Sequence, residues 1–157
     1  MDNEKKIEVF NSLIIINNDR IEGYKTAEAE AKETDLKMLF SDLMETSVQN
    51  RKELVEEVKK LGGTPDEGTR ATDKFFRVWM DVKAAFTNND RETILDSCEY
   101  GEDVILETYK KKLIQEHQDT NTIDQDMLNK HYALLKVDHD KVKNLRDAIA
   151  NEKKLTE

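Results

Sequence analysis

Four long stretches of the chain repeat apolar residues at three- and four-residue spacing, the pattern of amphipathic α-helices. They begin near residues 4, 34, 89 and 122, and each runs for roughly 26–30 residues, or about 40 Å at the rise of an α-helix. The 157 residues include only one proline and five glycines, so few positions favour tight turns. The sequence therefore predicts an all-α protein and argues against a β-sandwich or a β-barrel.

The connection between the second and third stretches is much longer than the other two. The second stretch ends at residues 62–65, Gly-Gly-Thr-Pro, where glycine favours a helix cap and proline prevents further helix. Residues 62–88 then carry an apolar pattern of their own around Trp79, which predicts a short helix inside a long crossover. Such a crossover leaves the second and third long helices parallel, and this predicts a ferritin-like four-helix bundle.

Length, charge and cysteine content limit the class of protein further. We expect one domain over residues 1–150 and a charged C-terminal tail, residues 151–157, that frays. The net charge of −9 argues against binding to nucleic acid or to an anionic membrane. The single cysteine, Cys98, cannot form a disulfide within the chain, and the longest apolar run, residues 13–16, is too short to span a membrane. These features predict a cytoplasmic protein.

Several polar residues fall on the apolar faces of the four predicted helices. Counting 1.5 Å per residue along the crossover topology places most of them at one level near the middle of the bundle. Because buried polar groups must be paired, we expect a hydrogen-bonded cluster that fixes the register of the helices. The predicted polar core cluster comprises Asn17, Ser47, Arg51, Glu102, His131 and Asp138.

The alternative interpretation of this layer is a metal site. Carboxylates and histidines that project into a bundle hold the ions of di-iron proteins, and the candidate ligands here are Glu22, Glu102, Asp138 and His139. A di-iron centre requires a Glu-x-x-His motif on each of two helices, and no histidine of this chain has glutamate three residues before it. The absence of this motif favours the structural cluster and leaves a mononuclear or degenerate iron, manganese or zinc site as the alternative.

Three apolar residues of the first helix, Val9, Ile15 and Ile16, lie away from its main apolar stripe. One interpretation is that the crossover segment covers them. The other is that they form the surface through which two copies of the chain make a homodimer.

Several short motifs resemble an uncharacterised bacterial family of four-helix-bundle proteins that belongs to the ferritin-like superfamily and is classed as a domain of unknown function. They occur, in order, at residues 22–24, 61–65, 79–86, 98–103 and 139–147, and the run Cys98-Glu99-Tyr100-Gly101-Glu102-Asp103 is the most specific. The resemblance covers about residues 7–147. It implies a ferritin-like fold in a bacterial cytoplasm and supplies no activity. Of the recurrent positions, Glu22, Glu102 and His139 are those that could form an inward polar site.

Two functions follow from this reading of the sequence. The first is a non-enzymatic binding or stress-associated bundle protein, because the helical pattern is complete and no complete catalytic constellation accompanies it. The second is a metal-dependent oxidoreductase with its ion among the four candidate ligands. The sequence identifies no protein partner.

Overall fold

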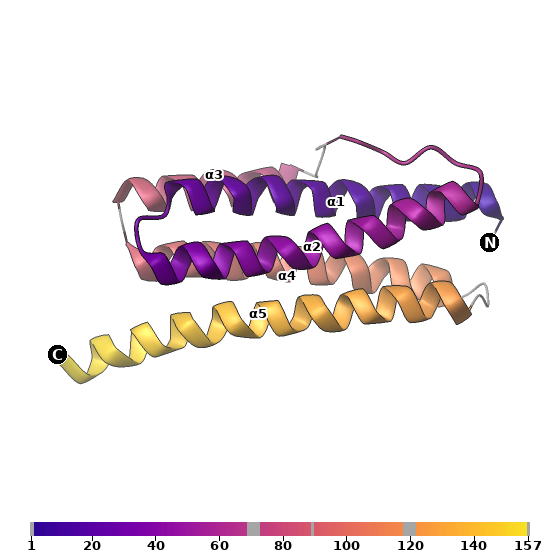
Figure 1. Ribbon diagram of the computed structural model, residues 1–157. Coiled ribbons are helices and arrows are strands. Elements are labelled where there is room, and N and C mark those ends of the chain that lie inside the picture. The colour runs from indigo at the N-terminus through magenta and orange to yellow at the C-terminus, as the bar shows by residue number, and fades with distance from the viewer. Residues whose placement is uncertain (1, 69–72, 89, 118–121, 157) are drawn as a thin grey trace.

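The computed structural model describes residues 2–68, 73–88, 90–117 and 122–156 (Figure 1). Within these residues the chain forms five α-helices and no strand. The helices are α1 (Asn3–Glu30), α2 (Thr34–Lys60), α3 (Asp73–Asn88), α4 (Arg91–His117) and α5 (Thr122–Thr156). The predicted all-α fold is confirmed.

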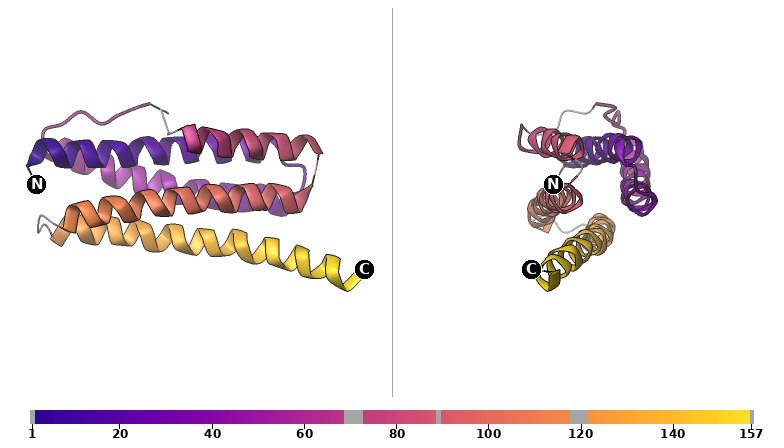
Figure 2. Two further views of the ribbon diagram at one scale, coloured as in Figure 1. Left: turned by 180° about the vertical axis from the view of Figure 1, so that it is seen from behind. Right: turned by 90° about the vertical axis from the view of Figure 1, so that its left-hand side faces the viewer.

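The four long helices form two antiparallel hairpins, α1 with α2 and α4 with α5 (Figure 1). A long crossover that contains α3 joins the hairpins and returns the chain to the end of the bundle at which α2 began. As a result α2 and α4 run in the same direction, which confirms the crossover topology predicted from the sequence. The end-on view in Figure 2 shows α3 on the outside of the bundle, beside α1 and α4.

The run Gly-Gly-Thr-Pro ends α2 as expected. Gly62 adopts a φ of 82°, a conformation that favours glycine because it lacks a Cβ atom. The backbone N–H of Gly62 donates to the carbonyl of Lys59 at 3.0 Å, and that of Gly63 donates to the carbonyl of Val58 at 2.9 Å. These hydrogen bonds satisfy carbonyls of the last helical turn and direct the chain out of the helix.

The first part of the crossover follows α1 and is attached to it by two asparagines. Asn11 accepts a hydrogen bond from the backbone N–H of Asp66 at 2.8 Å and donates to the carbonyl of Thr64 at 3.2 Å. Asn18 donates to the carbonyl of Gly68 at 3.0 Å. The crossover therefore covers one side of α1.

This packing corrects the expectation of a homodimer through Val9, Ile15 and Ile16. Val9 is 2% exposed and Ile16 is 7% exposed, and Ile15 is half-buried. The reason is that α1 contacts α2, α3 and α4 while the crossover follows its remaining side. Within one chain Val9 and Ile16 are therefore core residues, and Ile15 stays partly accessible.

The last helix is longer than the sequence pattern indicated. α5 continues to Thr156, so residues 151–156, which we expected to fray, are helical. Lys153 contributes to this extension, because its Nζ lies 2.6 Å from an Oε2 of Glu92 in the first turn of α4. No helix of the described part of the chain has the length and apolar character that a membrane crossing requires.

Candidate functional site

The centre of the bundle contains a buried arginine that contacts all three other long helices. Arg20 lies on α1 and is 1% exposed. Its Nε and Nη2 donate to Oε1 of Glu102 on α4 at 3.0 and 2.8 Å, and Nη2 also donates to Oδ2 of Asp138 on α5 at 3.0 Å. Its Nη1 donates to two groups on α2, the carbonyl of Leu43 at 2.6 Å and Oγ of Ser47 at 2.9 Å. One guanidinium group thus fixes α1 relative to α2, α4 and α5.

Tyr24 completes this set of contacts, which we call the Arg20 cluster (Arg20, Tyr24, Ser47, Glu102 and Asp138). Tyr24 lies one turn after Arg20 and donates its hydroxyl to the same Oε1 of Glu102. Burial raises the pKa of Glu102, and the attraction and hydrogen bonds of Arg20 and Tyr24 act in the opposite direction. Burial alone would lower the pKa of Arg20, but Glu102, Tyr24 and Asp138 raise it above its ordinary value. Arg20 is therefore a permanent positive charge inside the bundle.

A second buried network lies one turn further along α1, towards the N-terminus. The side-chain amide of Asn17 donates to the hydroxyl of Tyr109 at 2.9 Å, and that hydroxyl lies 3.2 Å from Nδ1 of His131. Nε2 of His131 lies 2.8 Å from Oε2 of Glu53, which is partly exposed. If the Tyr109 hydroxyl donates to Nδ1, a neutral imidazole donates its Nε2 proton to Glu53, and both ring nitrogens of His131 are satisfied. The network joins α1, α2, α4 and α5, as the Arg20 cluster does.

We expect His131 to make the stability of the protein depend on pH. Burial lowers the pKa of His131, and Glu53 opposes that shift only in part. The unfolded chain then binds a proton at a higher pH than the folded chain, so the free energy of unfolding falls as pH is lowered from about 6.5, the ordinary histidine pKa. Urea unfolding between pH 7.5 and 5 should show this decrease, and the slope should be smaller in His131→Gln. An equal slope in the variant would contradict the prediction.

Most residues of the predicted polar core cluster are buried at the two networks. Asn17, Ser47, Glu102, His131 and Asp138 all lie inside the bundle. Arg51 does not contact them: it is half-buried at the side of α2, where its Nε donates to Oδ1 of Asn18 at 2.6 Å. The cation inside the bundle is Arg20, which was not among the residues predicted from the sequence. Its position, one turn from Asn17 and one turn from Tyr24 on the same face of α1, is the signal that identifies it.

The structure does not bring the four predicted metal ligands together. Glu102 and Asp138 both contact Arg20. Glu22 is exposed and borders a groove between α1 and α3. His139 lies at the contact between α4 and α5, where its neighbours are other carboxylates.

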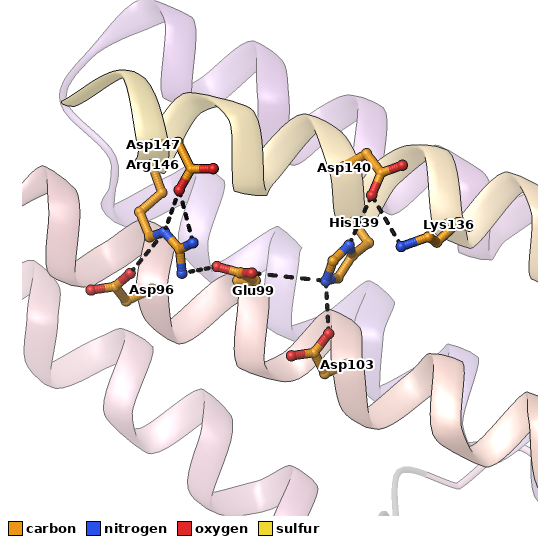
Figure 3. A network of polar contacts seen from close by, with 8 residues as sticks. All are labelled: Asp96, Glu99, Asp103, Lys136, His139, Asp140, Arg146 and Asp147. Atoms are coloured by element: carbon orange, nitrogen blue, oxygen red, sulfur yellow. Dashed lines mark hydrogen bonds and ion pairs between the residues drawn. The ribbon is translucent and has the colours of Figure 1, made fainter. Parts of the chain in front are cut away.

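A polar patch at this contact brings a histidine close to two carboxylates (Figure 3). Nε2 of His139 lies 2.7 Å from Oδ1 of Asp103 and 3.9 Å from Oε1 of Glu99, and both carboxylates come from α4. On its other side, Nδ1 of His139 lies 3.1 Å from Oδ1 of Asp140. The second oxygen of Glu99 forms an ion pair with Arg146. The patch as drawn also includes Asp96, Lys136 and Asp147.

Glu99, Asp103 and His139 each offer one potential ligand atom, and these atoms lie within 4.8 Å of one another. Glu99 and Asp103 are four residues apart, so they lie on one face of α4. His139 is buried, Glu99 is half-buried and Asp103 is exposed. The site is therefore open to solvent on one side and packed on the other. We call these three residues the α4–α5 triad.

The four long helices and the long crossover between α2 and α4 define a ferritin-like four-helix bundle. A phenylalanine-to-glutamate mutant of Dps1 from Mycobacterium smegmatis has a similar structure, with a TM-score of 0.77 and 14% sequence identity, over 92% of this chain and 96% of that chain. The model of a family described as a domain of unknown function, DUF2383, matches residues 5–115, and the chain belongs to this family. A search of curated proteins finds no match.

The ferritin-like fold raises the question of a metal centre inside the bundle. Such centres use a glutamate from each of two helices and a Glu-x-x-His motif from each of the other two. Here the interior carboxylates, Glu102 and Asp138, hold the guanidinium group of Arg20, and the sequence has no Glu-x-x-His motif. A divalent ion between these carboxylates would lie against a fixed positive charge. The interior therefore does not fit a ferritin-type metal centre.

Proposed function

We propose that this protein is a non-enzymatic metal-binding bundle of the bacterial cytoplasm that holds one divalent transition-metal ion at the α4–α5 triad. The observation that carries this proposal is the convergence of Glu99, Asp103 and His139, whose ligand atoms lie within 4.8 Å of one another. The interior of the bundle has a different role in this proposal. Each of its two polar networks joins α1, α2, α4 and α5 by hydrogen bonds and holds the scaffold on which the triad lies.

The donor set of the α4–α5 triad suits zinc, manganese or ferrous iron. Imidazole nitrogen and carboxylate oxygen are common ligands of these ions, and a site with three protein ligands leaves a position for water. The backbones of α4 and α5 hold the ligands on rigid elements. Asp140 supports the site as well, because a carboxylate on the second ring nitrogen orients a ligating histidine.

The two ring nitrogens of His139 have separate roles in this proposal. Both face carboxylate oxygens, Nε2 that of Asp103 and Nδ1 that of Asp140. A metal ion bound to Nε2 leaves the hydrogen bond between Nδ1 and Asp140 in place. Because a ligating nitrogen must be unprotonated, we expect binding to weaken as pH falls.

Calorimetric titration of the chelator-treated protein with Zn²⁺ and with Mn²⁺ tests the proposal. We expect one ion per chain for at least one of the two metals, and at least a tenfold loss of affinity in His139→Ala. Asp96→Asn is the matched control, since Asp96 lies in the same patch and pairs with Arg146 but is outside the triad. Its affinity should stay within about twofold of the original protein.

Two results would overturn this function. One is the absence of stoichiometric binding of either metal. The other is binding that His139→Ala leaves unchanged, because the ion would then lie elsewhere. Circular dichroism of each variant checks that the helical content is preserved.

A further inference from the structure

A groove between α1 and α3 is separate from the α4–α5 triad and from the buried networks. Its volume is about 510 Å³, which is within the range of small-molecule pockets. One wall is formed by residues of α1 that include Glu22 and Glu30, and the other by residues of α3 that include Trp79, Met80 and Phe86. The groove therefore has an acidic side and an apolar, aromatic side.

The aromatic side is firmly anchored to the core. The ring of Trp79 packs edge-to-face against Tyr24, with centroids 4.9 Å apart, and Phe86 packs in the same way against Phe40 at 6.0 Å. Tyr24 and Phe40 are fully buried. Met80 also lines the groove and is 57% exposed, so its side chain is accessible to a ligand there. Methionine is a flexible, polarisable residue that suits variable ligands.

The acidic side has a clear excess of negative charge. Asp19, Glu22 and Glu30 line the groove from α1, and among the lining residues that the structure describes the single cation is Lys83 on α3. Glu22 and Glu30 are exposed, so a ligand can contact their carboxylates directly from solvent. The charge of the whole chain, −9, adds to the attraction for a cation and to the repulsion of an anion.

We propose that this groove binds a lipophilic organic cation, a positively charged nitrogen or phosphorus centre that carries aromatic or alkyl groups. The cationic centre is attracted by Glu22 and Glu30 and by the faces of aromatic rings, of which indole is the strongest. The apolar groups of the ligand cover Met80 and Trp79. A neutral hydrophobic molecule lacks the first set of contacts, and an anion is repelled by the same carboxylates.

The sequence supplies a direct probe of this groove, because Trp79 is the only tryptophan of the chain. Tetraphenylphosphonium is a suitable cation, and tetraphenylborate is an anion of nearly the same size and shape. We expect tetraphenylphosphonium to change the fluorescence of Trp79 saturably, and tetraphenylborate to have no saturable effect. Raising the salt concentration should weaken the binding of the cation, since exposed charges are screened.

Two double variants distinguish the effect of charge in the groove on binding from the effect of charge elsewhere on α1. Glu22→Gln with Glu30→Gln removes two carboxylates from the groove, and the affinity for tetraphenylphosphonium should fall roughly fivefold or more. Glu4→Gln with Glu8→Gln removes two exposed carboxylates from the other end of the same helix, and the affinity should change less than twofold. Equal losses in the two variants, or equal binding of the borate, would overturn the proposal. Failure of metal binding at the α4–α5 triad would not affect it.

Discussion

Replacement of Arg20 by methionine is expected to lower the free energy of unfolding by about 3–5 kcal/mol, the usual cost of removing one partner of a buried ion pair. The large effect arises because Glu102 and Asp138 remain inside the bundle without their cation. Oε1 of Glu102 would lose two of its donors, and its Oε2 already lacks a hydrogen-bond partner among the described residues. Urea unfolding followed by circular dichroism measures the loss.

A second variant separates the charge from the geometry. In Arg20→Lys the positive charge remains, but a single ammonium group cannot reach Glu102, Asp138 and Ser47 at once as the planar guanidinium does. We expect this variant to be less stable than the original protein and more stable than Arg20→Met. If Arg20→Lys is as stable as the original protein, the fork geometry of the arginine has no role.

The triple variant Arg20→Met, Glu102→Leu and Asp138→Leu tests whether the cluster stabilises the bundle or mainly specifies its register. Apolar replacement of a whole buried ion cluster is often neutral or stabilising, so most of the loss in Arg20→Met should be recovered. If the cluster specifies the register, the triple variant should show poorer dispersion of its amide signals in an NMR spectrum despite the recovered stability. A triple variant as unstable as Arg20→Met would instead show that the ion pairs themselves stabilise the fold.

The fold could be predicted because its determinants are local in sequence. The apolar spacing of each long helix, and the run Gly-Gly-Thr-Pro that ends α2, are visible without any tertiary information. The length of the chain between α2 and α4 then determines whether those helices are parallel. Whether Val9 and Ile16 form a homodimer surface could not be predicted in this way, because the exposure of these residues depends on where the crossover lies.

The polar interior was harder to predict because the contacts of a polar side chain depend more on the direction in which it points than on its height along the bundle. Asp138 and His139 are at one level, but neighbouring residues of a helix point about 100° apart, so only Asp138 faces Arg20. Glu22 is two residues after Arg20 and therefore points to almost the opposite side of α1. Residues at one height in a bundle can thus belong to different sites.

Arg20 illustrates a further limit of sequence patterns. Arginine is rarely buried, so a pattern that expects apolar residues on the inner face treats it as a surface residue. Its burial is possible only because Glu102, Asp138 and Ser47 come from three other helices, and no single helix reveals their convergence.

Replacement of Gly23 by alanine is expected to destabilise the protein, although alanine is the better helix former by about 1 kcal/mol. A Cβ atom on Gly23 would overlap the six-membered ring and the bridging carbons of Trp79. The indole packs against Tyr24 on one side, so relief of the overlap requires the indole to give up this contact or α3 to shift. Overpacking of this kind costs about 1–3 kcal/mol, and we expect a net loss of roughly 1–2 kcal/mol with a shift in the emission of Trp79.

Combination with a smaller residue on α3 tests this cause directly. Trp79→Leu alone should destabilise the protein by opening a cavity next to Tyr24, but it also removes the ring that a Cβ atom on Gly23 would meet. In the Trp79→Leu background, Gly23→Ala should therefore be neutral or stabilising, and the two losses should not add. If Gly23→Ala lowers the free energy of unfolding equally with either residue at position 79, contact with the indole ring is not the reason for glycine. The close approach of α1 and α3 must then depend on their backbones.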